Sequence, residues 1–343
     1  MNSLERKQFI EQKCCQKNIN LETQEYIKQY ISLNETLFGS FLDIDNIINK
    51  VLSNLNSSIK ITPVSISELK HNGRWNGFRH YIYVNPVNMI LSKLLKSEKN
   101  KVTSIIMHEL DHCANTKYVP ISDHDKNIFL EDILKEYKMK GRKINRVKNY
   151  IDKKYKQGIL PISGISDKRQ SIQNNINLTQ LDEGITAWKQ EMYEKQLGIR
   201  PYRIYSFEKE VAKFISDMIG KENLIQMHFN NDYEGIKKLF KDNTGTELND
   251  LVKKMNDKPK FNILLNSIPI AGKIYRRKFN NKRMEFYTDF QQSMQVIKKQ
   301  YQEKRRTDFV PKFIVNSQTI DGNAQEKIEN KKENIETPEV SCR

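Results

Sequence analysis

The residues of this chain that are best suited to chemistry are two histidines and a glutamate in the segment His108-Glu109-Leu110-Asp111-His112. In a helix of about 3.6 residues per turn, His108 and His112 stand one above the other on one face, with Glu109 beside them. Two imidazoles at this spacing can hold one zinc ion, and the adjacent carboxylate can act on a water bound to that zinc. The spacing therefore predicts a zinc site that still needs a third protein ligand.

The position of the third ligand distinguishes the zinc enzymes that share this motif. A histidine six residues after His112 is typical of metzincins, but Tyr118 occupies that position. His124 follows soon after, but Pro120 separates it from the helix and its neighbours are polar, so we do not favour it. The better candidate is Glu183, much further along the chain.

Glu183 stands near the start of a second predicted helix. Thr179 and Asp182 have capping-box spacing, which indicates a helix start. The expected buried stripe of this helix consists of Leu181, Ile185, Trp188 and Met192. Because Glu183 lies off that stripe, it can complete a zinc site of two histidines and one carboxylate, with the fourth position open for water. The alternative is that Glu183 only stabilises the helix dipole from the first turn.

Residues 108–112 and residues 182–186 (DEGIT) together resemble the gluzincin branch of the zincin metallopeptidases. The second segment is similar to the Asp-Glu-Gly-x-Thr-Glu sequence of many bacterial zincin-like proteins. The resemblance covers residues 59–245 and implies a zincin-like metallopeptidase fold of class α+β, mostly helical, with a small twisted sheet. It also implies one zinc ion (Zn2+) per chain, held by His108, His112 and Glu183.

The resemblance also implies catalytic roles. Zinc lowers the pKa of its bound water to about 7, and Glu109 takes the proton and later returns it to the leaving amine. In gluzincins a tyrosine or histidine after the glutamate ligand stabilises the oxyanion. Tyr205 is our first choice for this role, ahead of Tyr202 and His228. Ala187 stands where some gluzincins have an acid that orients a histidine. The acids left for that role are Asp111, Asp182 and Glu191.

Two segments before the metal-binding helix predict strands. Residues 59–66 are rich in isoleucine and valine, and Pro63 indicates an edge position. Residues 79–84 alternate Ile82 and Val84 with two tyrosines. An edge strand there could accept an extended peptide, but an ordinary half-buried strand is the favoured interpretation. Residues 158–164 contain glycine and proline and predict a loop.

These patterns predict four parts in chain order. Residues 1–58 form an N-terminal helical extension, and residues 59–245 form the zincin-like catalytic core. Residues 246–310 form a helical C-terminal lobe with a basic patch, and we expect residues 311–343 to be a disordered tail. Within these parts, apolar spacing predicts helices over residues 21–31, 44–55, 207–219, 221–229 and 233–241.

The composition limits the classes of function and partner. The formal net charge of +16 and the basic segments 135–156 and 273–283 suggest an anionic partner, although a solvated basic face is the commoner outcome. No apolar run is long enough to span a membrane, and the first residues lack the apolar core of a Sec signal. Four scattered cysteines form no disulfide framework. We therefore expect a cytoplasmic protein by default, with non-Sec export or delivery to a host cell left open.

The favoured function is a zinc-dependent metalloendopeptidase that hydrolyses peptide bonds in a protein or peptide substrate by metal-activated water. The alternative is a zincin-fold protein without protease activity that binds nucleic acid or an anionic surface through its basic patches.

Overall fold

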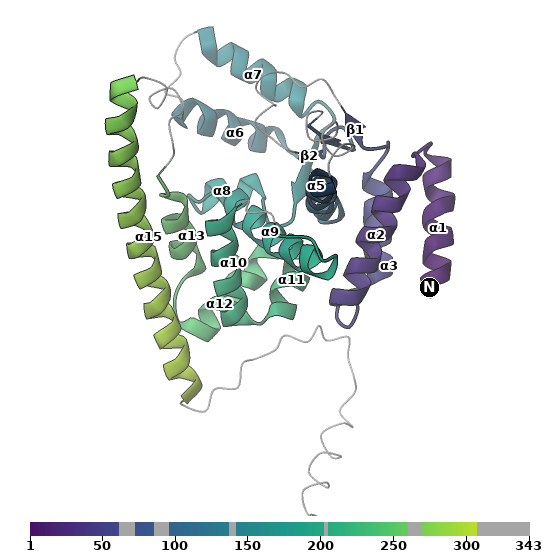
Figure 1. The fold of residues 1–343 in the computed structure, drawn as a ribbon. Helices are drawn as coiled ribbons and strands as arrows, with labels where there is room; N and C mark the ends of the chain where they lie inside the picture. Colours follow the sequence, from purple (N-terminus) through teal and green to yellow (C-terminus); the bar gives the residue numbers. More distant parts are fainter. Residues whose placement is uncertain (62–72, 86–95, 137–141, 202–204, 260–268, 307–343) are drawn as a thin grey trace, which may run out of the picture. The chain divides into compact units, whose positions relative to one another are not determined.

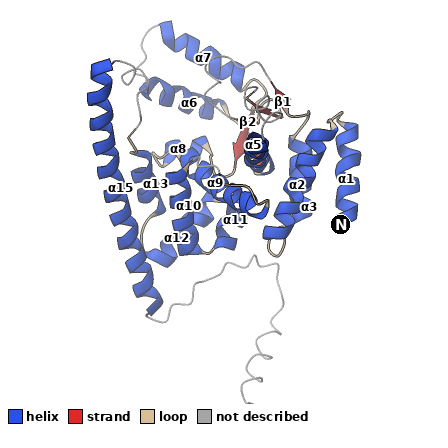
Figure 2. Ribbon diagram, in the orientation of Figure 1, coloured by secondary structure: helices blue, strands red, loops and turns tan. Residues whose placement is uncertain are grey.

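The computed structural model describes residues 1–61, 73–85, 96–136, 142–201, 205–259 and 269–306 (Figure 1). These residues are mostly helical with two small sheets, which confirms a mostly helical α+β class (Figure 2). The described residues all belong to one compact unit. The zincin-like form of the fold and the four-part division stay predictions, and the predicted tail, residues 311–343, lies outside the described residues.

Three N-terminal helices form a group, two of which pack against the helix that carries His108 and His112. They are α1 (Ser3–Gln16), α2 (Leu21–Phe38) and α3 (Ile44–Asn54), and each begins after an Asn or Asp whose side chain accepts from the first backbone N–H groups. Helices α2 and α3 both contact α5 (Lys96–Ala114). Residues 1–58 thus form part of the wall around α5.

Helix α5, which carries both histidines, is buried along most of its length. The predicted apolar residues Ile106, Leu110 and Cys113 have no exposed surface. The polar residues Ser104 and Asn115 are also buried, because α9 (Leu178–Gln196) packs against α5 in addition to α2 and α3. A polar stripe inside the core must be matched by polar partners, and these partners form the candidate site.

The first sheet contains β1 (Lys60–Ile61), β2 (Gly73–Asn76) and β3 (Tyr81–Val84) in the order β1-β3-β2. Strand β3 pairs with β1 in parallel and with β2 in antiparallel register. The edge-strand alternative for residues 79–84 is therefore wrong, because β3 has a neighbour on each side. Alternation of side chains shows which faces are buried and says nothing of how many strands lie alongside. In the described part of this sheet, β1 and β2 are the edges; residues 62–66 of the first predicted strand lie outside the described residues.

The second sheet is the antiparallel pair β4 (Thr116–Pro120) and β5 (Ile159–Ser163). The loop predicted over residues 158–164 is thus wrong for the five residues of β5. Pro161 led to that prediction, but a strand with a single partner tolerates a proline, and β4 is the only partner of β5 among the described strands. Its buried residues Leu160 and Ile162 join a small core with α6 (Asp123–Glu136) and α7 (Arg142–Lys154).

Six further helices are described. They are α8 (Lys168–Gln173), α10 (Ser206–Ile219), α11 (Lys221–Phe229), α12 (Tyr233–Thr244), α13 (Leu248–Asn256) and α15 (Pro269–Arg306). Three of them, α10, α11 and α12, confirm the predicted helical spacing. Helix α9 begins earlier than predicted, because Asn177 is its cap and accepts from the backbone N–H of Thr179. Glu183 therefore lies in the second turn, beyond the reach of the first-turn dipole role.

Helix α10 packs against both α9 and the long helix α15. Helices α9 and α10 approach closely at Gly184, where an added Cβ would lie 2.4 Å from the carbonyl oxygen of Glu208. Helix α15 runs beside α10 and α12 (Figure 1) and packs Phe286, Tyr287 and Phe290 around Phe207 of α10. Residues 273–283, predicted to be a basic patch, lie in α15.

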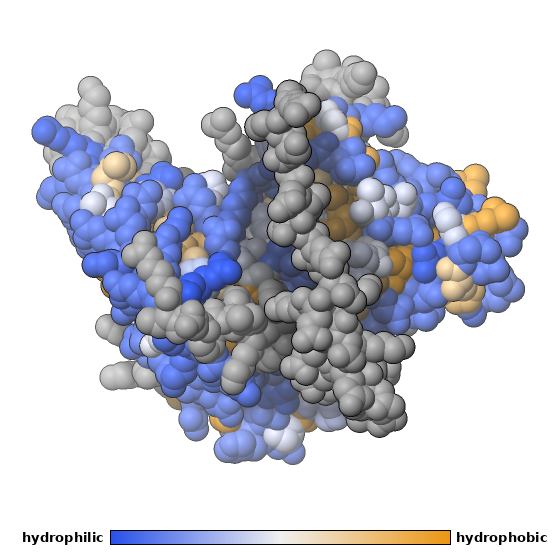
Figure 3. Space-filling model, turned by 90° about the horizontal axis from the view of Figure 1, so that it is seen from below, coloured by the Kyte–Doolittle hydropathy of each residue, from blue (hydrophilic) through white to orange (hydrophobic). Residues whose placement is uncertain are grey.

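The described surface has no large apolar face in the view of Figure 3, where it is mostly hydrophilic. None of the described helices combines the length and the apolar character that a membrane span requires.

Candidate metal centre

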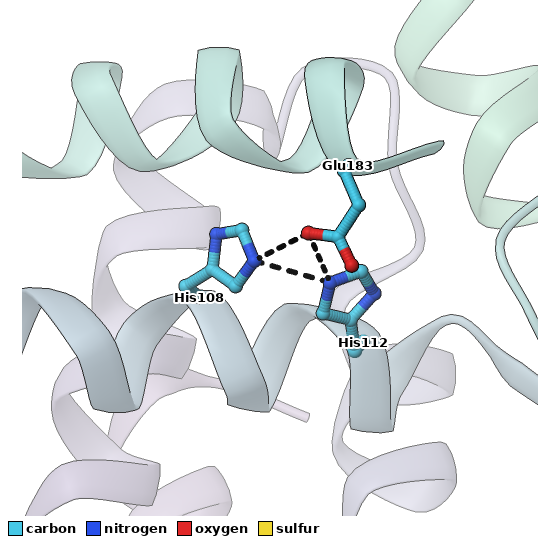
Figure 4. A group of neighbouring side chains, drawn as sticks. All are labelled: His108, His112 and Glu183. Atoms are coloured by element: carbon cyan, nitrogen blue, oxygen red, sulfur yellow. Dashed lines mark hydrogen bonds and ion pairs between the residues drawn. The ribbon is translucent and has the colours of Figure 1, made fainter. Parts of the chain in front are cut away.

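Three side chains from two helices converge on one point. His108 and His112 project from α5, and Glu183 projects toward them from α9 (Figure 4). The Nε2 atoms of the two histidines are 3.1 Å apart. Glu183 Oε2 lies 3.1 Å from His108 Nε2 and 3.5 Å from His112 Nε2. The structure thus brings together the three predicted ligands.

This triangle has the dimensions of one face of a tetrahedral zinc site. With zinc bonds of about 2.0–2.1 Å, tetrahedral ligand atoms stand about 3.3 Å apart, close to the three observed separations. Two nitrogens and a carboxylate oxygen form the donor set of catalytic zinc centres with one open position. The residues present therefore fit a zinc ion.

The electrostatics of the triangle favour a positive charge at its centre. Burial lowers the pKa of His112, but the carboxylates of Glu183, Asp182 and Glu109 outweigh that effect and raise it to about 10. The pKa of His108 is also raised, because the effect of Glu183 outweighs that of burial. Burial also raises the pKa of Glu183, but the two imidazoles hold it well below its usual range. A divalent ion would supply this positive charge and release protons from the imidazoles.

His108 is oriented by a residue that the sequence analysis did not identify. Its Nδ1 lies 2.9 Å from Gln190 Oε1. Gln190 stands seven residues after Glu183, which is about two helical turns and hence the same face of α9. That spacing was the available signal, but an acidic partner was expected for the histidine, and Gln190 is an amide.

His112 is oriented by β5 and by Asp182. Its Nδ1 lies 3.0 Å from the hydroxyl oxygen of Ser163, which also donates to the backbone carbonyl of His112. Asp182 Oδ2 is 3.6 Å from the same nitrogen, an ion-pair distance rather than a hydrogen bond. Asp182 Oδ1 accepts from the backbone N–H of Ile165 and from His228 Nε2, each at 2.9 Å.

The acids considered as histidine partners have different positions. Asp182 is beside His112, as described. Asp111 points away from the triangle into the core and pairs with Lys189. Glu191 faces α10 and pairs with lysines there. Asp111 and Glu191 therefore do not orient either histidine directly.

Glu109 lies beside the triangle and is held by a strand. Its Oε2 accepts from the backbone N–H of Trp75 at 2.6 Å. The Cβ that is missing at Gly73 would lie 3.3 Å from Glu109 Oε1, so β2 passes close to the carboxylate. Burial raises the pKa of the Glu109 carboxyl, against the opposing effect of the two histidines. A carboxylate with a raised pKa is suited to accept and return a proton.

Tyr205 also faces the site. Its ring stacks on that of His108 with the ring centres 6.0 Å apart, and Tyr205 lines the same cleft as Glu183. Burial, followed by Glu183 and Glu109, raises the pKa of its phenol well above the usual range, so it remains a proton donor. Tyr205 has a left-handed backbone with φ of 50°, which is strained for a residue with a side chain.

Three other residues were candidates for the oxyanion donor or the third ligand, namely His228, His124 and Tyr202. His228 has no exposed surface and donates to Asp182 behind His112. His124 is exposed on α6 and is not one of the converging residues. Tyr202 lies outside the described residues.

The triangle opens into a cleft of about 880 Å³. Strand β2 and helices α5, α9, α10 and α15 all contribute residues to it. Among these are two arginines, Arg74 of β2 and Arg283 of α15. The cleft is therefore large enough for several residues of a peptide.

The chain has no significant match among protein-family models, curated proteins or solved structures. The functional argument therefore depends on the side chains in this cleft.

Proposed function

We propose that this chain is a zinc-dependent metalloendopeptidase of the gluzincin type, which hydrolyses peptide bonds in a protein or peptide substrate by metal-activated water. The observation that carries the proposal is the convergence of His108, His112 and Glu183 at tetrahedral spacing, with Glu109 beside them in an open cleft. When bound, zinc would polarise the scissile carbonyl and lower the pKa of water.

Glu109 is the general base in this proposal. It takes a proton from the attacking water and delivers that proton to the leaving amine. The N–H of Trp75 holds one carboxylate oxygen and thus fixes the direction of the other. Two histidines and a carboxylate also bind iron in some oxygenases, but that chemistry needs no proton-accepting glutamate beside the ligands. Glu109 therefore favours hydrolysis over oxidation.

Tyr205 is the proposed oxyanion donor. Its ring stacks on His108 and it lines the cleft together with Glu183, so its hydroxyl is close to a group bound beside these two residues. A donor that is in place before the reaction stabilises the developing negative charge without reorganisation. The strained backbone of Tyr205 is consistent with a residue held for such a purpose.

Strand β2 is the proposed binding edge for the substrate backbone. Among the described strands, β2 pairs only with β3, so its other edge lacks a described partner strand. It lines the cleft through Gly73, Arg74 and Trp75. An extended peptide can add to such an edge through main-chain hydrogen bonds. Residues 79–84, the candidate considered for this role in the sequence, form the central strand β3 instead.

The two cleft arginines predict a preference for acidic substrate residues. Neither Arg74 nor Arg283 forms an ion pair with a carboxylate in the described part of the chain. Arg283 instead rests on the ring of Tyr287, 5.2 Å from its centre. A guanidinium group so placed can bind a carboxylate in a fork geometry. The anionic partner expected from residues 273–283 would then be the substrate itself.

The binding of nucleic acid or an anionic surface through segment 135–156 stays a prediction. Helix α7 exposes Arg146, Lys148 and Lys153 in this segment, a pattern that a solvated face also produces. A steep decrease in nucleic-acid affinity with salt would support this alternative function.

Metal analysis combined with three variants tests the proposed function. We expect close to one zinc per chain, lost in His108→Ala and Glu183→Ala and retained in Glu109→Gln. Cleavage of a peptide library, followed by mass spectrometry, should disappear in all three variants. His124→Ala is the matched control, because His124 is exposed and is not one of the three converging residues. Proteolysis by Glu109→Gln at the parent rate would refute the catalytic assignment.

A further inference from the structure

A buried polar group behind His108 has no part in the chemistry proposed above. Gln190, whose Oε1 faces His108 Nδ1, donates from Nε2 to Ser104 Oγ and, at 3.1 Å, to Glu194 Oε1. Ser104 Oγ in turn donates to Glu194. Each of these three side chains is at most 3% exposed. The group therefore connects α5 and α9 inside the core, away from water.

Glu194 determines which way the Gln190 amide points. Because Ser104 Oγ donates its proton to Glu194, it can only accept from Gln190, so the amide must turn its NH2 group toward Ser104 and Glu194. Its oxygen must then face His108. Because an amide oxygen only accepts, the proton of that hydrogen bond belongs to His108 Nδ1. Nε2 is thus the nitrogen of His108 that can give up its proton and turn a lone pair toward Glu183 and His112.

We propose that Glu194, acting through Gln190 and Ser104, is a positioning residue that fixes His108 in the Nδ1–H tautomer required for a metal ligand at Nε2. The inference depends on the metal-binding role of His108 in the proposed function and not on peptide hydrolysis. Outer partners of metal-binding histidines are usually a carboxylate, a backbone carbonyl or water in direct contact. Here an amide stands between the histidine and the carboxylate.

The intervening amide has a physical reason. A carboxylate at position 190 would lie next to the buried carboxylate of Glu194, and two like charges at that distance raise the pKa of one of them until it takes up a proton. Gln190 avoids this repulsion, because it accepts from His108 on one side and donates to Glu194 on the other. The swap variant Q190E/E194Q removes the same repulsion by exchanging the two groups, with net charge unchanged.

Zinc affinity, measured by competition with a fluorescent chelator, tests this inference without a peptide. Gln190→Leu should weaken zinc binding by about 10- to 100-fold, the usual effect of losing an outer partner. The swap variant should bind zinc within roughly threefold of the parent, because His108 Nδ1–H again has an acceptor. Glu191→Gln is the matched control on the same helix, since Glu191 pairs with lysines of α10, and it should leave the affinity unchanged.

The tautomer gives a second measurement that a purely structural role would not affect. In zinc-loaded protein labelled with 15N-histidine, the parent and the swap variant should show a His108 Nδ1–H proton that exchanges slowly with water. Gln190→Leu should show fast exchange at that nitrogen, because the buried acceptor is gone.

Two results would overturn the inference. The first is parent zinc affinity in folded Gln190→Leu, and the second is a folded swap variant as weak as Gln190→Leu. If Gln190→Leu does not fold, Glu194→Gln takes its place, and a swap variant that binds zinc no more tightly than Glu194→Gln overturns the inference. A chain that binds zinc as predicted here but cleaves no peptide would refute the proposed function and leave this inference standing.

Discussion

Replacing Lys189 with methionine tests the polar interior that supports the metal-binding helix. Lys189 Nζ donates to Asp111 Oδ1 at 2.6 Å, and the two side chains are 1% and 0% exposed. Asp111 Oδ1 also accepts from the hydroxyls of Tyr30 and Tyr193, and Oδ2 accepts from Asn115. Lys189→Met leaves these neutral donors but removes the positive charge that opposes the desolvation of Asp111.

The size of the stability loss in Lys189→Met depends on the protonation of Asp111. Breaking a buried ion pair costs about 3–5 kcal/mol. Asp111 limits that loss by taking up a proton, which costs at most about 4 kcal/mol at pH 7 for a carboxyl with an unfolded pKa near 3.9. In the variant the folded pKa of Asp111 is raised, so the loss decreases as the pH falls. We expect Lys189→Met to lower the free energy of unfolding by about 3–4 kcal/mol at pH 7, and by about 1.4 kcal/mol less than that at pH 6.

Urea unfolding of metal-free protein at pH 7 and pH 6 measures this loss. Asp111→Asn in the Lys189→Met background should recover most of the stability, because no buried charge remains. Lys195→Met is the control on the same helix, since Lys195 is 65% exposed and should contribute less than about 1 kcal/mol. A loss below about 1 kcal/mol in Lys189→Met, or a loss that is equal at both pH values, would refute the reasoning.

Four further predictions concern the cleft and its supports. Tyr205→Phe should lower kcat for peptide cleavage by about 10²–10³-fold with zinc content unchanged, and unchanged kcat would remove Tyr205 as the oxyanion donor. Glu191 has a pKa lowered to about 2, because its lysine partners outweigh burial. The stability that the ionised Glu191 contributes is therefore complete above about pH 4.5 and is lost as the pH falls toward 2. Glu191→Gln should lower the free energy of unfolding by up to about 3 kcal/mol at pH 7 and by less than half of that at pH 3. Chemical unfolding at both pH values measures this difference. Gly184→Ala should destabilise the chain by about 1–3 kcal/mol in thermal unfolding, since the added Cβ meets the Glu208 carbonyl. Arg283→Gln should reduce kcat/KM about fivefold for peptides with Asp or Glu near the cleaved bond and not for neutral peptides, whereas Lys282→Gln, its exposed neighbour outside the cleft, should change neither.

The helices were the predictable part of the fold. Apolar residues at helical spacing identified α2, α3 and α10–α12, because each buries one continuous face. The strands were less predictable. β3 was considered as an edge strand and is central, and β5 was predicted as a loop because of its proline and glycine neighbours. Strand pairing depends on contacts distant in sequence, which alternation within one segment does not contain.

The candidate site was predictable where its spacing is local. His108, Glu109 and His112 lie within five residues, so helix geometry alone places them together. Their supports come from other elements. Trp75 reaches Glu109 from β2, and Ser163 reaches His112 from β5. Nothing in the sequence around residues 108–112 indicates Trp75 or Ser163 as a partner, because these contacts exist only once the sheets have formed.

The segment Asp182-Glu183-Gly184 shows why a short motif can be informative outside its own helix. Successive residues on a helix point about 100° apart, so three neighbours face three directions. Asp182 faces β5 and His228, where it accepts the N–H of Ile165. Glu183 faces the two histidines, and Gly184 faces α10, where the backbone carbonyl of Glu208 leaves no space for a Cβ. Each residue type thus meets a different neighbour, and together these contacts direct Glu183 toward the two histidines.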